Sequence, residues 1–368
     1  MSRLGILLPL SCLPSHYGIG DMGDYAYAFL RILQRNHIRY WYINGLHEER
    51  SLTYEKSYYA GNPIYISLDE LVSMKLLRRS ELRHFHKFSV NVLYDDILHF
   101  KNMYYIKAFQ RFQKWEQRKK QEYNQFCEQH WVRAYAKYGI DDLDEEEIAY
   151  RIFLQYIYDV QWRNLKQYAN DLGIKLMVDL SFQKQGFDKD YVKLYQGEKK
   201  LYVYQTLLTY LCERYDIVYC KGKIDLVEYM YIKDALYNMI EKEKRILFDK
   251  DVNIFNFTKQ QTSRWFCTSD YEKGSLMYQY CKLEYKDKVR MKRVLQTLET
   301  KNKKFSHKVI LWGMKQKHEI FFVALWDVIH MKVKLHEDNI TFRFTKVSQI
   351  KKVMEVLEEL IMSTKDIL

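Results

Sequence analysis

The chain has 368 residues, of which 48% are hydrophobic and 29% are charged. This composition is typical of a folded globular protein and excludes a disordered chain. The low content of 13 Gly and 3 Pro excludes collagen-like and Pro-rich architectures. No apolar run approaches about 18 residues, so we predict no membrane-spanning helix and no membrane partner. The net charge of +12 suits an anionic partner without requiring one.

Six cysteines are spread along the sequence, and no CxxC pair occurs. Disulfide frameworks belong to short secreted chains, and zinc sites need clustered ligands. We therefore predict reduced thiols, a cytoplasmic protein, and no metal or other cofactor. The N-terminus, with Arg3 before the apolar run Leu4–Leu13, is similar to a short signal peptide. However, no small-residue cleavage site follows it, and Leu4–Leu8 also fits a buried strand.

The elements predicted in chain order begin with this strand at Leu4–Leu8. The loop 14–21 follows, and then comes a helix whose apolar residues recur at helical spacing: Ala26, Phe29, Leu30 and Leu33. Tyr40–Ile43 is the second predicted strand. A strand, a helix and a second strand in this order form a βαβ unit, which predicts a parallel sheet.

Residues 76–140 are highly charged and helical in period, and no linker separates them from their neighbours. We interpret them as a helical subdomain inserted into a single domain that covers residues 1–368. The acidic cluster within 141–147 precedes a helix and favours its N-terminus, and Gly173 is the predicted C-cap of that helix. Strands at Ile174–Leu180 and Asp216–Cys220 follow. This alternation indicates an α/β protein, and a (β/α)8 barrel is the simplest closed arrangement.

Four segments together carry a family resemblance. They are Gly5–Asp21, similar to SLPxxYGIGDLG after a strand; Arg39–Trp41 with Ala60–Leu68, similar to RYWQ and AGNPLLISL; Phe153–Leu180, similar to FLQ…QW…LK.YAN..GI…GDLPIY; and Phe322–Asp327, similar to VPLQD. They occur in the same order as in the 4-alpha-glucanotransferase (amylomaltase) family, which this chain resembles over about half of its length.

The resemblance implies a (β/α)8 TIM barrel with helical insertions, reduced relative to the family, whose site lies at the carboxyl ends of the strands. It makes Leu4–Leu8 the first barrel strand rather than part of a signal peptide. It also implies retaining transfer of α-1,4-glucan segments between maltooligosaccharides or starch-like glucans. In that chemistry one carboxylate attacks the anomeric carbon, a second protonates the leaving oxygen, and a third binds ring hydroxyls.

The nucleophile position of the family pattern FDxVRIDH holds a lysine in this chain. Tyr215–Val218 matches the start of the pattern, with Asp216 as its structural Asp, and Lys221 then stands at the place of the attacking carboxylate. A lysine cannot form the glycosyl ester, and its charge opposes an oxocarbenium-like transition state. Asp225 would replace it only if the register slid by four residues, which disrupts the strand match.

The general acid belongs to a family segment, IIAEDLG, that nothing in this chain resembles. Glu241, Asp249 and Asp251 are available carboxylates, but we predict that no apolar strand flanks them and that the segment is deleted.

The third carboxylate stands in the family's GTHDNDT, which Cys267–Glu272 fits through Thr268 and Asp270, with Ser269 in place of His. Asp270 is therefore the candidate survivor of the three, and an exposed loop or N-cap aspartate is the alternative interpretation.

For substrate binding, the resemblance implies contacts from Trp41, Tyr54 and Asp179 to an α-1,4-glucan or maltooligosaccharide. Counting back from Gly61 aligns Thr53 with the sugar-contacting Tyr of the family and leaves Tyr54 one place off. The basic runs are interleaved with acids, which is typical of solvated helix faces, so we predict no nucleic-acid partner.

Two functions fit these observations. In the first, the chain is a 4-alpha-glucanotransferase with a rearranged and impaired site. In the second, it is a non-catalytic pseudoenzyme that binds α-glucan or an unidentified protein partner. The lysine at 221 favours the second.

Overall fold

A computed structural model describes residues 3–43, 46–48, 57–85, 94–138, 144–181, 200–221, 226–243, 245–248, 252–254, 265–269, 274–298, 304–316, 318–331 and 343–365. Tyr54 and Asp270, two of the predicted site residues, lie outside these ranges. Within them, no helix combines the length and apolar character that a bilayer crossing requires.

The core of the fold is one sheet of eight strands in the order β7-β6-β5-β2-β1-β10-β9-β8, and every pairing in it is parallel. Its strands are β1 (Arg3–Leu7), β2 (Tyr40–Tyr42), β5 (Lys175–Ser181), β6 (Ile217–Lys221), β7 (Ile246–Phe248), β8 (Val252–Ile254), β9 (Trp265–Cys267) and β10 (Ile320–Ala324). A separate antiparallel pair joins β3 (His47–Glu48) to β4 (Ser57–Gly61).

The four strands predicted from the sequence are confirmed as β1, β2, β5 and β6 of this sheet. The order is that of successive barrel strands, running from β1 to β7 on one side and from β10 back to β8 on the other. Only residues 249–251 separate β7 from β8. A parallel crossover needs about a dozen residues or more, so β8 cannot follow β7 as an ordinary βα unit does. The described strands confirm an α/β fold with a parallel sheet, and closure into a complete barrel stays a prediction.

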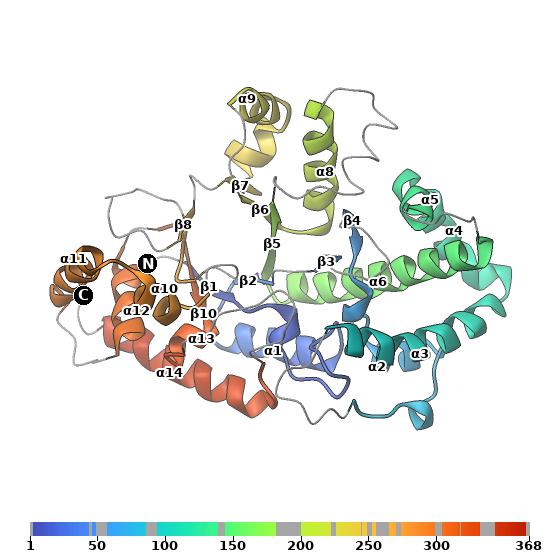
Figure 1. The fold of residues 1–368 in the computed structure, drawn as a ribbon, viewed down its shortest axis with the longest axis horizontal. Helices are drawn as coiled ribbons and strands as arrows, with labels where there is room; N and C mark the ends of the chain where they lie inside the picture. The colour runs from blue at the N-terminus through green and yellow to red at the C-terminus, as the bar shows by residue number, and fades with distance from the viewer. Residues whose placement is uncertain are drawn as a thin grey trace.

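Helices surround the sheet (Figure 1). They are α1 (Asp24–Arg35), α2 (Leu68–Ser73), α3 (Tyr94–Gln113), α4 (Gln121–Cys127), α5 (His130–Lys137), α6 (Glu145–Asp171), α8 (Lys200–Arg214), α9 (Leu226–Ala235), α10 (Leu276–Lys282), α11 (Tyr285–Gln296), α12 (Phe305–Lys315), α13 (Leu325–Val328) and α14 (Val347–Lys365). Figure 1 shows α3, α4 and α5 gathered along α6, at the end of the molecule opposite α10–α12. Whether residues 76–140 form a subdomain of their own stays a prediction.

The longest helix, α6, begins and ends as the sequence predicts. The Asp144 side chain caps it by accepting hydrogen bonds from the backbone N–H groups of Glu146 and Glu147, at 2.8 and 3.4 Å. Past its other end, Gly173 has a φ of +70°, a left-handed conformation that favours glycine. Asp144 therefore has a capping role.

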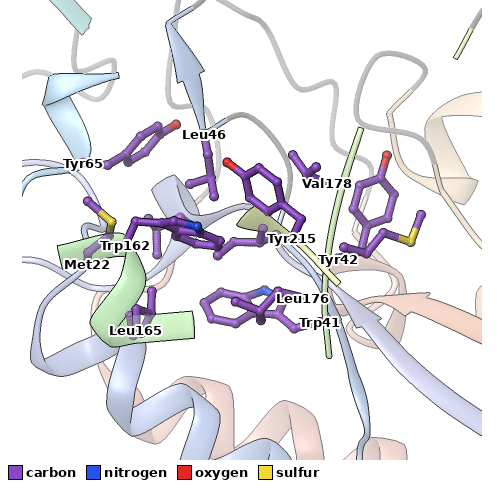
Figure 2. Close-up of a cluster of buried hydrophobic side chains, with 14 of the residues drawn as sticks. Met22, Trp41, Tyr42, Leu46, Tyr65, Trp162, Leu165, Leu176, Val178 and Tyr215 are labelled. Carbon is purple, nitrogen blue, oxygen red and sulfur yellow. The ribbon is translucent and has the colours of Figure 1, made fainter. Parts of the chain in front are cut away.

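A large part of the core lies between the sheet and the helices. Trp41 on β2 packs against Phe29 of α1 with ring centroids 4.9 Å apart, and Trp162 of α6 packs against Tyr215 at the same separation. Figure 2 shows Trp41, Trp162 and Tyr215 on one side of the sheet and Tyr42 on the other. Side chains alternate between faces along a strand, so Trp41 and Tyr42 necessarily face opposite ways.

Candidate functional site

One face of the sheet is concave. The evidence for this curvature is that side chains from strands that are not neighbours in the sheet meet over that face. The ring centroids of Tyr40 on β2 and Trp265 on β9 lie 6.1 Å apart, although β1 and β10 separate these strands. Gly5 on β1 lies beneath this contact, where a Cβ would come within 2.5 Å of the Phe322 ring. A glycine at this position therefore allows the aromatic rings to close over the middle of the sheet.

The carboxyl end of the concave face carries an ion pair between β5 and β6. Asp179 lies opposite Tyr219, and Lys221 is two residues further along β6, so the three side chains share one face. Tyr42 pairs with Met177, two residues before Asp179, which identifies that face as the concave one. Lys221 Nζ lies 2.7 Å from Asp179 Oδ2. The structure thus places Lys221 where the sequence register put it, at the strand end where barrels hold their reacting groups.

Both partners of this ion pair are largely removed from solvent. The side chains of Lys221 and Asp179 are 9% and 14% exposed. A buried ammonium group is tolerated when an anionic partner compensates its charge, and the Asp179 carboxylate supplies that compensation here. Its second oxygen, Oδ1, is buried and has no hydrogen-bond partner in the part of the chain that the structure describes.

The prediction that no apolar strand flanks the carboxylates of 241–251 is wrong. Ile246–Phe248 forms β7, pairs in parallel with β6, and leads directly into Asp249. A strand therefore does precede Asp249, and only residues 249–251 separate it from β8. Three apolar residues between charged neighbours were too short a pattern to identify from the sequence. Asp249 and Asp251 lie outside the described residues, and Glu241 is engaged with Lys233 at 3.0 Å.

The segment expected to hold the third carboxylate follows β9. Thr268 and Ser269 are completely buried, and the backbone N–H of Thr268 donates to the Phe322 carbonyl at 3.0 Å, which extends the pairing with β10. Asp270 comes next in the chain and lies outside the described residues. The structure describes the exit of β9 up to that position.

Trp41 is placed away from the concave face. Its side chain is completely buried, and its Nε1–H donates to the Leu8 carbonyl at 2.8 Å. The ring packs against α1 on the outer side of the sheet, where no ligand reaches it without unfolding the core. We therefore leave Trp41 out of the proposed site, as a core residue in this structure.

Two motif glutamines of α6 hold backbone segments instead of facing the concave side. Gln155 accepts from the Gly61 N–H and donates to the Gly61 carbonyl, at 2.9 and 3.0 Å. Gln161 makes the same pair with Ser67, at 2.7 and 3.1 Å. These amide clamps fix the loop 61–67, which includes the Asn62–Pro63 motif. Matching motif letters revealed the positions, but the sequence alone gave no reason for the two glutamines.

The aspartate expected to be structural has that role. Asp216 Oδ2 accepts a hydrogen bond from the Leu176 N–H at 2.8 Å and so joins the start of β6 to β5. This contact supports the strand register from which the position of Lys221 follows.

A parallel α/β sheet with helices around it defines an α/β protein, a class in which the carboxyl ends of the strands are the usual place of a site. Comparisons with known proteins then narrow the class. Residues 8–140 and 139–188 match the family model described as 4-alpha-glucanotransferase. The 4-alpha-glucanotransferase of Aquifex aeolicus is 29% identical over 214 residues, which make up 49% of this chain and 43% of that protein.

Other relatives give the same result. The 4-alpha-glucanotransferase of Streptococcus pneumoniae serotype 4 is 29% identical over 212 residues, or 48% of this chain and 42% of that one. The amylomaltase of Streptococcus agalactiae, solved in complex with acarbose, matches the fold with a TM-score of 0.76 at 16% identity and covers 99% of each chain. Residues 8–188 of this chain are thus similar to the 4-alpha-glucanotransferase family. The sequence match spans less than half the length of the curated relatives.

Proposed function

We propose that this protein binds α-1,4-glucans at the carboxyl end of its concave sheet face and is impaired in the glucan transfer that its relatives' names describe. The observation that carries this proposal is the ion pair between Lys221 and Asp179, with Nζ and Oδ2 separated by 2.7 Å. It supports the proposal because it holds an ammonium group at the strand end where the family resemblance expects the attacking carboxylate.

The chemistry of that ammonium group is unsuited to the reaction. Retaining transfer forms an ester between a carboxylate and the anomeric carbon, through a transition state with positive charge on the sugar. Lys221 offers no carboxylate, and its charge raises the energy of a positive sugar ring held nearby. Asp179 is a carboxylate on this face, and its interaction with Lys221 offsets its negative charge.

Glucan binding needs hydrogen bonds and apolar contact but no ester. The Asp179 side chain, which is 14% exposed, provides a carboxylate as an acceptor for a ring hydroxyl. Tyr42 and Tyr219 share the same concave face, where their rings are buried. Asp270 and Tyr54 stay candidate binding residues outside the described ranges.

The alternative is a 4-alpha-glucanotransferase with a rearranged but working site. One observation favours it: β7 is present and leads directly into Asp249, a carboxylate that could serve as the general acid. In this alternative a carboxylate other than residue 221 would have to attack the sugar.

The proposal has further parts: a complete barrel, an inserted subdomain at 76–140, a cytoplasmic location and a protein partner.

The test uses the purified full chain with maltotriose as substrate and acarbose as ligand. We expect glucose release at or near background, and acarbose binding that is detectable by titration calorimetry and weakened in Asp179→Ala. Lys221→Asp alone should not restore glucose release, because the shortened segment after β7 would remain. The proposal is contradicted by robust wild-type turnover that Asp270→Ala or a change of a carboxylate within 241–251 abolishes.

A further inference from the structure

Another buried aspartate, Asp327, follows β10. In the sheet, β10 lies on the other side of β1 from β5 and β6, the strands that carry the Lys221–Asp179 pair. Asp327 lies in α13, directly after β10, and is completely buried. Thr268 Oγ1 and Ser269 Oγ donate hydrogen bonds to its Oδ2 at 2.8 and 2.5 Å. The backbone N–H of Leu276 donates to its Oδ1 at 2.9 Å. All the hydrogen bonds described for this carboxylate come from neutral donors.

These hydrogen bonds join three elements. Thr268 and Ser269 form the exit of β9, and Leu276 is the first residue of α10. The network continues into β10 and α13, because the Ala324 N–H donates to Thr268 Oγ1 at 3.0 Å and the Trp326 Nε1–H donates to Ser269 Oγ at 3.2 Å. Figure 1 shows α10, α12 and α13 together beside β10. The Asp327 carboxylate thus contacts the described residues on both sides of the connection from β9 to α10: Thr268 and Ser269 before it, and Leu276 after it.

Burying a carboxylate costs free energy unless ion pairs or hydrogen bonds compensate for the loss of its contact with water. Burial raises the pKa of Asp327 to about 7, and the three hydrogen bonds oppose that shift only in part. Apolar side chains would fill the same space without this cost. A polar centre at this place is therefore best explained by the geometry that it imposes on the chain around it.

That geometry concerns the carboxyl end of the sheet. β9 and β10 are parallel neighbours, so the exit of β9 lies at the same edge of the sheet as the ends of β5 and β6. The described flanks, Ser269 and Leu276, border the chain segment in which the family resemblance places a glucan-binding carboxylate.

We propose that Asp327 is a positioning residue for glucan binding, which fixes the exit of β9 and the start of α10 at the carboxyl edge of the sheet. The inference rests on the proposed function, since it presumes that a glucan occupies this edge. Asp327 acts through the residues that it holds and does not itself contact the sugar, because its side chain is closed off from solvent.

The experiment measures maltoheptaose affinity by calorimetry for the full chain and for variants that are shown to be folded at the measuring temperature. Asp327→Ala removes all three acceptor contacts, so affinity should fall by about tenfold or more. Asp327→Asn should keep affinity within about threefold, since its amide oxygen can accept from Leu276 and its NH2 can donate to the two rotatable hydroxyls. Ser269→Ala and Thr268→Val remove single contacts and serve if Asp327→Ala does not fold.

A matched control is Asp159→Asn on α6, which changes another buried aspartate, one paired with Arg163 and Arg214 away from the proposed site. It should lose stability but keep its maltoheptaose affinity. A further readout is the indole N–H resonance of Trp326, which donates into the network. Maltoheptaose should shift this resonance in the wild type and leave it unchanged in Asp327→Ala.

The outcomes separate the two claims. A wild-type chain that binds no maltoheptaose contradicts the proposed function, and the positioning proposal falls with it. A wild type that binds, together with folded Asp327→Ala of equal affinity, overturns the positioning proposal alone. Equal losses of affinity in Asp327→Ala and Asp159→Asn also overturn it, because the effect would then follow general stability.

Discussion

The two halves of the chain differ in the role of the residues at positions that match the family motifs. In the half that ends with β5, the motif residues hold backbone in place: Gln155 and Gln161 clamp the loop 61–67, and Lys101 is buried against Asp21. In the other half, Lys221 is the last residue of β6, and only residues 249–251 join β7 to β8. In our proposal, the fold persists through its clamps while the positions of its chemistry change.

The largest expected effect comes from the clamp formed by Lys101 in the first half. Its Nζ is completely buried and donates to Asp21 Oδ2 and to the carbonyls of Ile64 and Ile66, at 3.0, 2.7 and 2.9 Å. Lys101→Ala leaves a buried aspartate without its partner, so the free energy of unfolding should fall by about 3–5 kcal/mol in a urea titration. Arg133→Ala breaks an exposed pair with Glu145 and should cost less than about 1 kcal/mol.

A smaller loss is expected from the glutamine clamps. Gln155→Ala leaves the N–H and carbonyl groups of Gly61 without their buried partners, which should lower the free energy of unfolding by about 2–4 kcal/mol. Gln167→Ala is the matched control, because Gln167 is an exposed glutamine of the same helix. Equal stability of the two variants in thermal unfolding would show that the clamp does not hold the loop.

Trp41→Phe sharpens the comparison between the two faces of the sheet. The change removes the hydrogen bond to the Leu8 carbonyl and part of a buried ring, so we expect a loss of about 1–3 kcal/mol in stability. Because the ring lies on the outer side of the sheet, acarbose affinity should not change. A large loss of affinity in a folded Trp41→Phe protein would return this residue to the site.

A further expected effect concerns pH and amounts to at most about 1.4 kcal/mol for each pH unit. Burial raises the pKa of Asp327 to about 7, above its ordinary value. The folded state therefore favours the protonated form, and the stabilisation from that form is lost as pH rises from about 4 through 7. Wild type should lose up to about 1.4 kcal/mol per pH unit relative to Asp327→Asn over this window. Parallel stability curves for the two proteins, from urea titrations at several pH values, would contradict the assignment.

Long, strongly patterned elements could be predicted from the sequence. The strands at Leu4–Leu8, Tyr40–Ile43, Ile174–Leu180 and Asp216–Cys220 were identified from apolar runs and helical spacing between them, and the parallel order followed from βαβ logic. The three-residue strand β7 could not be predicted, because so short an apolar run does not distinguish a strand from other secondary structure. Its presence is evident only from the pairing with β6, which is a tertiary interaction.

The site was predictable only in part. The resemblance to the family pattern FDxVRIDH gave the position of Lys221 at the end of a predicted strand. The partner of Lys221 could not be predicted, since Asp179 meets it through the pairing of β5 and β6 and lies far away in sequence. The hydrogen bonds of Asp327 to Thr268, Ser269 and Leu276 likewise join residues more than 50 positions apart.

The central claim is that no glycosyl ester forms at the strand end occupied by Lys221. Intact-protein mass spectrometry of the full chain, quenched after incubation with α-maltotriosyl fluoride, tests it directly, because a retaining reaction places the sugar covalently on a carboxylate. The account predicts no increase in mass for the wild type, because Lys221 offers no carboxylate to accept the sugar. A maltotriosyl adduct in near-stoichiometric yield on the wild-type chain, mapped by peptide digestion to a carboxylate, would contradict it.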